Sequence, residues 1–310
     1  MTFLDVSKKI IQKRKLLIFR VTAFHIKITR SKKVNCFQII KFVLDEAYNQ
    51  IEGNESEKDE SISEALVYLR DQYSKLLTGV TIDYSHPITR FAYIYAYVTS
   101  HANLVNTIID KSSDLSVLFD KEKVTVTCLG GGPGSDFLGI LKYLMLNSKN
   151  PRVSFKICDK EKAWLDSWEG VDNMVDPKFR ISTSYNSIDV TEPEDWQSLK
   201  NYFQSSDLFT MIYFMSEVQA LRDKADEFFA NLFEKAKSGA LFLFVDNNIP
   251  EFYDWFDELA DEFGVEILKS RRENILAPIH EEKKDLGEYY KKFGSPKIRA
   301  NVAYRIARKT

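Results

Sequence analysis

VTVTCLGGGPGSDFLGILKY, residues 124–143, changes its residue pattern twice within a short span. Its first residues alternate valine with threonine, which is typical of a β-strand. Glycines follow at Gly130, Gly132 and Gly134, and apolar residues then recur at helical spacing from Ser135 onward. Strand, glycine-rich loop and helix make up the first unit of a nucleotide-binding α/β sheet. Glycines let the backbone approach a ligand, and the start of a helix offers free N–H groups.

The spacing of the glycines excludes two common nucleotide motifs. A dinucleotide fingerprint requires G-x-G-x-x-G, and its last position falls on Ser135 or Phe137 in the two registers. A P-loop requires Gly-Lys-Ser/Thr after the glycines, and none follows. The pattern that remains is G-x-G-x-G at Gly130, Gly132 and Gly134, unless the run is a glycine-rich turn of some other α/β protein.

This pattern resembles motif I of the class I S-adenosylmethionine-dependent methyltransferases. The resemblance covers residues 121–308 and implies a Rossmann-like α/β fold, a mostly parallel sheet with an antiparallel last strand. It also implies S-adenosylmethionine as cofactor, with its methionine part beside the three glycines and Ser135. One position departs from the family, which often has an acid two residues before the first glycine. Cys128 stands there and cannot make that contact to the cofactor's amino group.

Two acids follow the next predicted strands. Asp159 comes directly after the strand predicted at 152–158, and a carboxylate there can accept both hydroxyls of a ribose. The same residue could also cap the helix that follows. Asp189 comes after the strand predicted at 179–186, and the resemblance implies that it contacts the adenine amino group.

The predicted strand 208–215 is almost continuously apolar, which indicates a central strand buried on both faces. It ends in FMSE, residues 214–217, where family members that methylate exocyclic amines carry D/N-P-P-Y/F. We expect Phe214 at the cofactor. Glu217 either accepts a proton from the methyl acceptor or stabilises the start of its helix as a first-turn acid.

The rest of the predicted sheet consists of a buried strand at 240–245 and an antiparallel pair at 265–269 and 299–306. The segment between that pair, residues 273–297, is charged, and we expect it to lie over the site. Tyr289, within this segment, is therefore a predicted substrate residue.

Residues 35–120 are predicted to form a helical cap, with an exposed, mobile acidic loop at 52–60. Within the helix expected at 88–109, Arg90, Tyr93 and Tyr97 are spaced by three and four positions and share one face. We expect this face to line the methyl-transfer pocket, with Tyr97 as a catalytic residue and the other two as substrate residues. The alternative is that the tyrosines are partly buried packing residues whose hydroxyls reach water.

The first 33 residues carry ten lysines and arginines against a single acid, Asp5. Three interpretations fit: a solvated basic arm, an RNA contact through phosphates, or an organelle presequence, although serine is scarce. The expected organisation is therefore a basic arm at 1–34, the helical cap at 35–120 and a methyltransferase domain at 121–310. With a net charge of −2, the chain as a whole does not create a positive electrostatic field that would attract nucleic acid.

Cysteine content and hydropathy indicate the cellular compartment in which the protein is expected. The three cysteines, Cys36, Cys128 and Cys158, have no paired spacing, which indicates a reducing compartment and no structural zinc. No apolar run reaches the roughly 18 residues of a membrane span. An intracellular protein, cytoplasmic or nuclear, without a bound metal is therefore expected.

The function predicted from the resemblance is S-adenosylmethionine-dependent methyl transfer. RNA is the leading acceptor because of the basic segment, followed by a small molecule or a protein. The order of the glycine loop, the Ser-Glu strand end and an Asp-Asn strand end also resembles fungal proteins assigned to methylate uridine in large-subunit ribosomal RNA. The alternative is a non-catalytic S-adenosylmethionine-binding sensor or scaffold.

Overall fold

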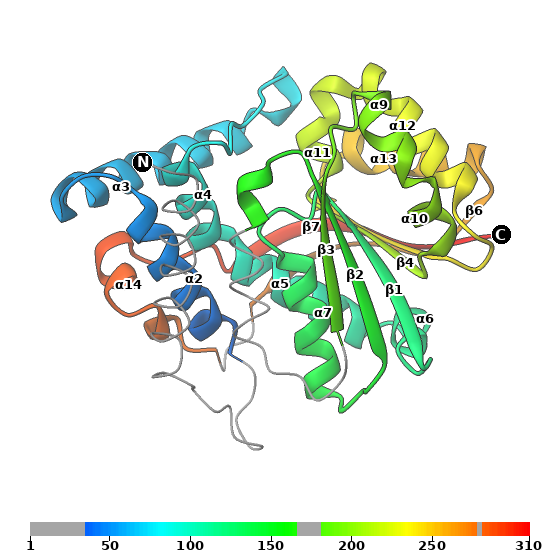
Figure 1. Cartoon of the computed structure of the whole chain (residues 1–310), viewed down its shortest axis with the longest axis horizontal. Coiled ribbons are helices and arrows are strands. Elements are labelled where there is room, and N and C mark those ends of the chain that lie inside the picture. The colour runs from blue at the N-terminus through cyan, green and yellow to red at the C-terminus, as the bar shows by residue number, and fades with distance from the viewer. Residues whose placement is uncertain (1–34, 166–180, 278–280) are drawn as a thin grey trace, which may run out of the picture. The chain divides into compact units, whose positions relative to one another are not determined.

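A computed structural model describes residues 35–165, 181–277 and 281–310. Within these residues seven strands form one sheet in the order β3-β2-β1-β4-β5-β7-β6 (Figure 1). β7 runs antiparallel to both of its neighbours, and the other strand pairs are parallel. This confirms the predicted Rossmann-like sheet of class I methyltransferases. The strands are β1 Lys123–Leu129, β2 Arg152–Asp159, β3 Ile181–Ser187, β4 Leu208–Ile212, β5 Leu241–Asn247, β6 Val265–Leu276 and β7 Arg299–Lys309.

The order of the strands determines where a ligand can bind. The chain places β2 and then β3 on one side of β1, and β4 pairs with the other side of β1. At such a reversal the connections after β1 and β4 leave towards opposite faces, and a crevice opens at the carboxyl ends of the two strands. The glycine loop follows β1 and residues 214–217 follow β4, so both lie at this crevice.

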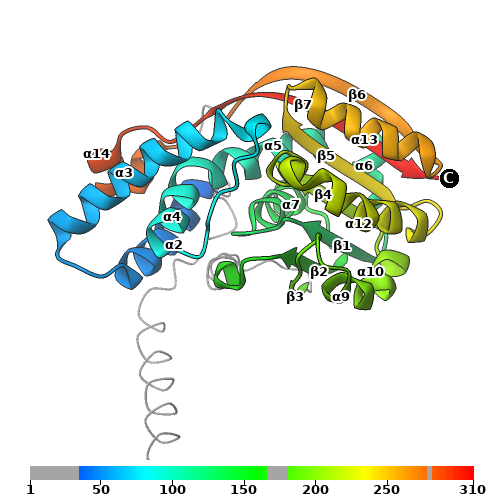
Figure 2. The same ribbon diagram turned by 90° about the horizontal axis from the view of Figure 1, so that it is seen from above.

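Helices cover both faces of the sheet (Figures 1 and 2). One face packs into an aromatic core that includes Phe228, Phe242 and Trp255, all fully buried. The helices on that face are α9 Pro193–Trp196, α10 Lys200–Ser205, α12 Arg222–Lys235 and α13 Pro250–Glu262. On the other face, α7 Ser135–Leu146 packs closely against α5 Thr99–Asp110. A Cβ at Gly139 would come within 2.5 Å of the Ala102 carbonyl oxygen, so this close packing requires glycine.

The described residues before β1, from residue 35 onward, are mostly helical, as predicted, but the helix boundaries differ. The helices are α2 Cys36–Gln50, α3 Glu55–Tyr73, α4 Pro87–Tyr93, a π-helical turn Ile94–Val98, α5 and α6 Ser113–Leu118. The prediction of a loop at 52–60 is wrong for most of that segment, because α3 already begins at Glu55. Asn54 and Glu57 form a reciprocal capping box there, and acids in the first turn favour a helix start.

The prediction that residues 273–297 lie over the site is wrong for Tyr289 and the helix around it, whereas Nζ of Lys297 lies 5.7 Å from the centroid of the Tyr213 ring. β6 continues to Leu276, and α14 Glu288–Phe293 packs beside α2 and α4 (Figures 1 and 2). Tyr289 is 3% exposed there, with its ring centroid 5.3 Å from that of Phe91 and 5.6 Å from that of Tyr48. Aromatic packing therefore holds this segment on the helical region.

The helix predicted after the fourth strand is interrupted. α11 Met215–Val218 and a 3₁₀ turn at Gln219–Leu221 precede α12.

Among the described residues, no helix is both long and apolar enough to cross a membrane. The same residues contain no cluster of three or more histidine, cysteine or acidic side chains that could hold a metal ion.

Candidate functional site

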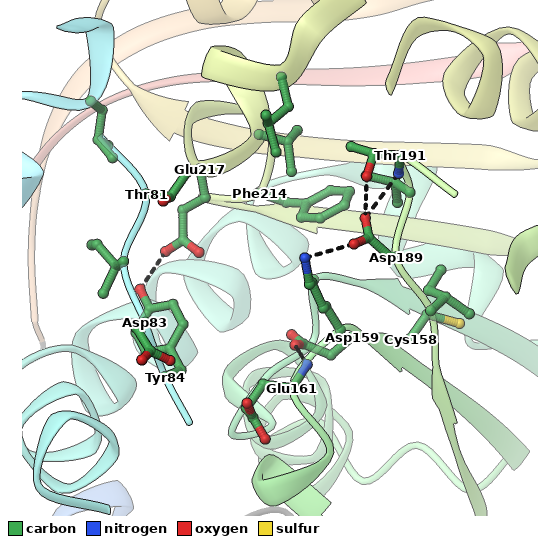
Figure 3. A pocket seen from close by; sticks show the side chains of 18 residues that line it. Thr81, Asp83, Tyr84, Cys158, Asp159, Glu161, Asp189, Thr191, Phe214 and Glu217 are labelled. Carbon is green, nitrogen blue, oxygen red and sulfur yellow. Dashed lines mark hydrogen bonds and ion pairs between the residues drawn. The ribbon is translucent and has the colours of Figure 1, made fainter. Parts of the chain in front are cut away.

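A cavity of about 480 Å³ lies where the sheet topology predicts a ligand (Figure 3). This cavity, the cofactor pocket, is bounded by the carboxyl ends of β1 and β2, the segments after β3 and β4, and the connection between α3 and α4. Its size is in the range of small-molecule sites. Its lining includes Leu76, Thr81, Ile82, Asp83, Tyr84, Gly130, Cys158, Asp159, Lys160, Glu161, Ile188, Asp189, Val190, Thr191, Phe214, Glu217, Val218 and Leu221.

The glycine loop reaches this pocket through backbone that other residues rarely adopt. Gly130, Gly132 and Gly134 have φ values of +62°, +39° and +84°. A Cβ at Gly130 would come within 2.2 Å of the Phe214 ring, so the loop and the residues after β4 are in direct contact. The N–H of Gly132 donates a 2.8 Å hydrogen bond to Oδ2 of Asp159, which ties the loop to the end of β2.

Asp159 retains acceptor capacity after its contacts within the protein. Its Oδ2 accepts from Gly132, and its Oδ1 accepts a 3.0 Å hydrogen bond from the N–H of Glu161. Each carboxylate oxygen has two lone-pair directions, so one on each remains for a pair of hydroxyls. Burial raises the pKa of Asp159 to about 6, against the backbone hydrogen bonds, which lower it. The helix-cap interpretation is compatible with this geometry, because the bond from Glu161 is itself a cap-like contact.

The segment after β3 forms an apolar slot with a polar edge. Ile188 and Val190 line the pocket on either side of Asp189. The Asp189 carboxylate pairs with Nζ of Lys160 at 2.6 Å and accepts hydrogen bonds from the N–H and hydroxyl of Thr191 (Figure 3). These partners hold the Asp189 carboxylate in place, and its predicted contact with adenine stays a prediction.

Glu217 forms a three-oxygen triangle with two tyrosines from the helical region. The hydroxyl oxygens of Tyr73 and Tyr84 are 2.5 Å apart, and each lies 2.8 Å from Oε1 of Glu217. Both tyrosine hydroxyls donate to Oε1 of Glu217, which accepts the two hydrogen bonds. Burial raises the pKa of Glu217 to about 7, against the two tyrosine hydrogen bonds, which lower it.

A second, smaller cavity of about 40 Å³ adjoins the cofactor pocket. This inner chamber shares Tyr84, Gly130, Asp159, Phe214 and Glu217 with the cofactor pocket. Its remaining lining residues are Tyr93, Gly132, Pro133, Trp164, Ile212 and Tyr213. Five of its eleven lining residues are therefore aromatic.

Most predicted cofactor residues meet at these two cavities. Gly130, Asp159, Asp189 and Phe214 line the cofactor pocket, and Gly132 lines the inner chamber. Glu217, predicted as an acid–base residue, lines both cavities. Gly134 and Ser135 line neither: the first precedes α7 with a left-handed φ, and the second is a buried first residue of α7. The ligand contacts predicted for all these residues stay predictions.

Of the residues predicted on the helix at 88–109, Tyr93 alone reaches either cavity. Its neighbour Tyr97 is 5.3 Å away between ring centroids, so the two share a face as predicted. Tyr97 packs against Tyr73 at 5.0 Å and lines neither cavity. The expectation that Arg90 lines the pocket is wrong: Nη1 of its guanidinium donates to the carbonyl oxygens of Tyr84 and Ser85. Arg90 thereby supports the segment that carries Tyr84.

Tyr289 does not line either cavity, so its predicted substrate role has no support from its position. Conversely, sequence reasoning missed Tyr73, Tyr84, Trp164 and Lys160. Lys160 directly follows Asp159 and could have been found from that adjacency. Tyr73 and Tyr84 lie 144 and 133 positions from Glu217, and no local pattern connects them.

Cys128 stands where methyltransferases that the sequence resembles often carry an acid; it is fully buried and does not line the pocket. An acid nevertheless lies beside it, because the thiol of Cys128 contacts Asp136 in the first turn of α7. Asp136 is 2% exposed and accepts a hydrogen bond from the Thr210 hydroxyl. It therefore holds β1, β4 and α7 together and is not exposed to a ligand.

Comparisons with known proteins concern the fold. No family model and no curated protein match the chain. Solved structures that match include a precorrin-6y C5,15-methyltransferase from Geobacter metallireducens GS-15, with 13% identity, a TM-score of 0.37, and 67% of this chain and 88% of that chain covered. A precorrin 8w decarboxylase of Methanobacterium thermoautotrophicum matches with 11% identity, a TM-score of 0.39, and 67% and 90% coverage.

A proposed RNA methyltransferase from Pyrococcus horikoshii matches with 17% identity, a TM-score of 0.39, and 67% of this chain and 83% of that chain covered. Several neighbours are thus methyltransferases of the same fold class. At these identities and TM-scores the likenesses say nothing about the activity, ligand or substrate of this chain.

Replacing Gly130 by alanine is expected to disturb the pocket directly. A non-glycine residue in the left-handed region costs about 1–2 kcal/mol, and the new Cβ would overlap the Phe214 ring. We therefore expect a lower melting temperature and weaker binding of S-adenosylmethionine in calorimetry. Gly239→Ala is the matched control, because Gly239 has a φ of +80° but open space around it. Equal ligand affinity in the two variants would contradict the assignment of the loop to the ligand site.

Proposed function

We propose that this protein binds S-adenosylmethionine in the cofactor pocket and transfers its methyl group to an acceptor. The observation that carries the proposal is the joint position of the glycine loop, Asp159 and Glu217 around one cavity at the switch point of the sheet. The ligand carries an adenosine and a methionine end, and its sulfonium supplies an already activated methyl group.

The lining divides into parts that fit such a ligand. Asp159 has acceptor positions for the two ribose hydroxyls. Ile188 and Val190 offer apolar contact to a flat base, and Asp189 lies at the edge of that slot. Gly130 and Glu217 lie where the cofactor pocket meets the inner chamber, and in this proposal the methionine end and the methyl group bind near Glu217.

The charge of the pocket distinguishes this ligand from nucleotides with phosphates. Five acids line the cofactor pocket, Asp83, Asp159, Glu161, Asp189 and Glu217, against one base, Lys160. A pyrophosphate would normally bind at a helix N-terminus. Here the first turn of α7 carries the buried acid Asp136, and no residue of α7 lines the pocket. An acidic pocket favours a ligand with a sulfonium and an ammonium group over one with phosphates.

Two measurements test this function. Calorimetry with S-adenosylmethionine and S-adenosylhomocysteine measures binding, and no binding of either would contradict the proposal. Chromatographic detection of S-adenosylhomocysteine produced in the presence of candidate acceptors measures transfer. A protein that binds both ligands and never produces S-adenosylhomocysteine is the predicted alternative, a sensor or scaffold.

RNA is the acceptor that we propose first, on the strength of the basic segment 1–33, which lies outside the described residues. The described rim of the cofactor pocket is acidic and would not attract phosphates by itself. Uridine of large-subunit ribosomal RNA, suggested by the fungal resemblance, stays a prediction within this proposal. A small molecule or a protein is the next candidate acceptor.

If the basic segment neutralises phosphates, RNA affinity is expected to fall steeply as salt rises, because binding releases counterions. Deleting residues 1–33 is expected to flatten the plot of log affinity against log salt, and to leave S-adenosylmethionine affinity unchanged. Filter binding of total RNA at several salt concentrations measures the slope. An unchanged slope in the truncated protein would leave the segment as a solvated arm.

A further inference from the structure

The inner chamber is a small space enclosed by aromatic rings beside the cofactor pocket. Its volume of about 40 Å³ is room for about three water molecules. Three of its aromatic side chains are in mutual contact, with ring centroids of Tyr84, Tyr93 and Trp164 lying 5.3–5.6 Å apart. Phe214 and Tyr213 complete the aromatic wall. The chamber can therefore hold one small group of a ligand, surrounded by rings.

Tyr213 is unusual in both its backbone and its side chain. Its φ of +57° is left-handed, which is rare for a residue other than glycine and is found most often at functional sites. The side chain is 4% exposed, and its hydroxyl has no hydrogen-bond partner among the described residues. A buried, unpaired hydroxyl costs free energy, so a ligand group in the chamber is a natural partner for it.

The charge of the chamber is negative or neutral throughout. Its lining contains the carboxyls of Asp159 and Glu217 and no lysine, arginine or histidine. Nζ of Lys297 lies outside this lining, 5.7 Å from the centroid of the Tyr213 ring. Electron-rich ring faces together with carboxylates attract ammonium groups and N–H donors, and they repel anions.

We propose that the inner chamber is the acceptor subsite, and that it takes a nitrogen that bears a proton and is either neutral or cationic. The carboxyl groups and aromatic rings of its walls disfavour carboxylate, phosphate and thiolate acceptors. This inference rests on the proposed function, because it assigns the acceptor of the same reaction. It names the acceptor group and leaves open whether RNA, protein or a small molecule carries that group.

Glu217 lies between the two cavities, where its carboxylate can take the proton that the acceptor nitrogen loses. Glu217 lines both cavities, and only its Oε1 has partners recorded among the described residues, Tyr73 and Tyr84. The carboxylate of Glu217 takes a proton from the acceptor nitrogen, before attack where the nitrogen is cationic and as the new bond forms where it is neutral. The lone pair of that nitrogen forms the N–C bond as the C–S bond of the sulfonium breaks, the sulfur keeps that electron pair, and Glu217 later returns the proton to water.

A binding experiment tests the chamber without knowledge of the natural acceptor. The protein is first saturated with S-adenosylhomocysteine, and methylammonium or acetate, two probes of similar size and opposite charge, is then titrated at constant ionic strength. The ring-N–H signal of Trp164 in NMR, assigned with a Trp164→Phe variant, reports occupancy. We expect methylammonium to bind at least tenfold more tightly than acetate.

Variants locate the binding. Removing an aromatic wall in Tyr93→Leu, which keeps the Trp164 reporter, should weaken methylammonium binding by roughly 2- to 30-fold. Tyr213→Phe, which keeps the packing, should weaken it by roughly 2- to 10-fold. Tyr68→Ala, at an exposed tyrosine of α3, is the matched control and should bind as the wild type does. Equal effects in the control, or equal affinity for acetate, would overturn the assignment.

The rival occupant of the chamber is the methionine end of the cofactor. In that case methylammonium would bind to the free protein and be displaced by S-adenosylhomocysteine, which would also overturn the inference. Failure of S-adenosylhomocysteine to bind at all would instead remove the proposed function. Transfer from tritiated S-adenosylmethionine adds a chemical test on total RNA, total protein and butylamine in separate reactions. Label that is stable to mild alkali is expected, whereas label released as methanol would identify a carboxyl acceptor and refute the inference.

Discussion

Glu217→Gln is expected to lower the rate of methyl transfer by roughly 10²- to 10⁴-fold, the usual contribution of a positioned acid–base group. Glutamine keeps the size of the side chain and accepts the hydrogen bonds of Tyr73 and Tyr84 through its carbonyl oxygen. It cannot accept the proton of the acceptor. Single-turnover rates of S-adenosylhomocysteine formation measure the effect, and S-adenosylmethionine affinity should change little.

The same residue sets the expected pH dependence. Because burial raises the pKa of Glu217 to about 7, its carboxylate is mostly protonated below that pH and cannot take another proton. The rate should therefore rise as pH increases through about 7 and then level off. The Gln variant should lack this rise. Glu194→Gln, at an exposed acid of α9, is the control and should keep both rate and profile. A Gln variant with the wild-type profile would leave Glu217 as a helix-stabilising acid only.

Asp159→Ala is expected to weaken S-adenosylmethionine binding by roughly 10- to 100-fold, because about 1–3 kcal/mol is lost when partners of a buried polar group stay unpaired. Two effects contribute: the ribose loses its acceptors, and the N–H groups of Gly132 and Glu161 lose theirs. Asp159→Asn separates them, since it keeps one acceptor oxygen and the shape of the side chain. Calorimetry measures affinity, and thermal melting reports any loosening of the glycine loop.

The ionisation of Asp159 gives this prediction a second readout. Burial raises its pKa to about 6, so protonation removes an acceptor position as pH falls through about 6. Affinity for S-adenosylmethionine should therefore decrease below about pH 6 in the wild type and depend less on pH in Asp159→Asn. Asp254→Ala, at an exposed acid of α13, should leave both affinity and its pH dependence unchanged. Wild-type affinity in Asp159→Ala would reduce Asp159 to a helix cap.

Local patterns in the sequence were sufficient for the fold. The strand, glycine loop and helix at 124–143, the apolar run before Glu217 and the alternating C-terminal strands are each confirmed in type. Such signals are reliable because periodicity and glycine placement act within a few residues of chain. Asp159 could be placed at the pocket for the same reason, since the end of a parallel strand is defined locally and its sheet edge by topology.

The boundaries of elements and the outer parts of the site depended on tertiary contacts. Acids and a capping asparagine extended α3 into the expected loop, and aromatic packing drew Tyr289 onto α2 and α4. Arg90 has the helical spacing of a pocket residue, but carbonyl oxygens of the preceding segment bind its guanidinium. In each case a competing local or tertiary partner outweighed the pattern.

The sequence by itself determined the class of fold, the sheet edge at which the cofactor pocket lies and the acids Asp159 and Glu217 at that edge. The tertiary structure alone decided which side chains complete the site. Tyr73 and Tyr84 meet Glu217 across 144 and 133 positions. Tyr84, Tyr93, Trp164 and Tyr213 converge on the inner chamber from separate elements. Contacts between such distant residues leave no periodicity in the chain, because they arise only when the helical region packs against the open end of the sheet.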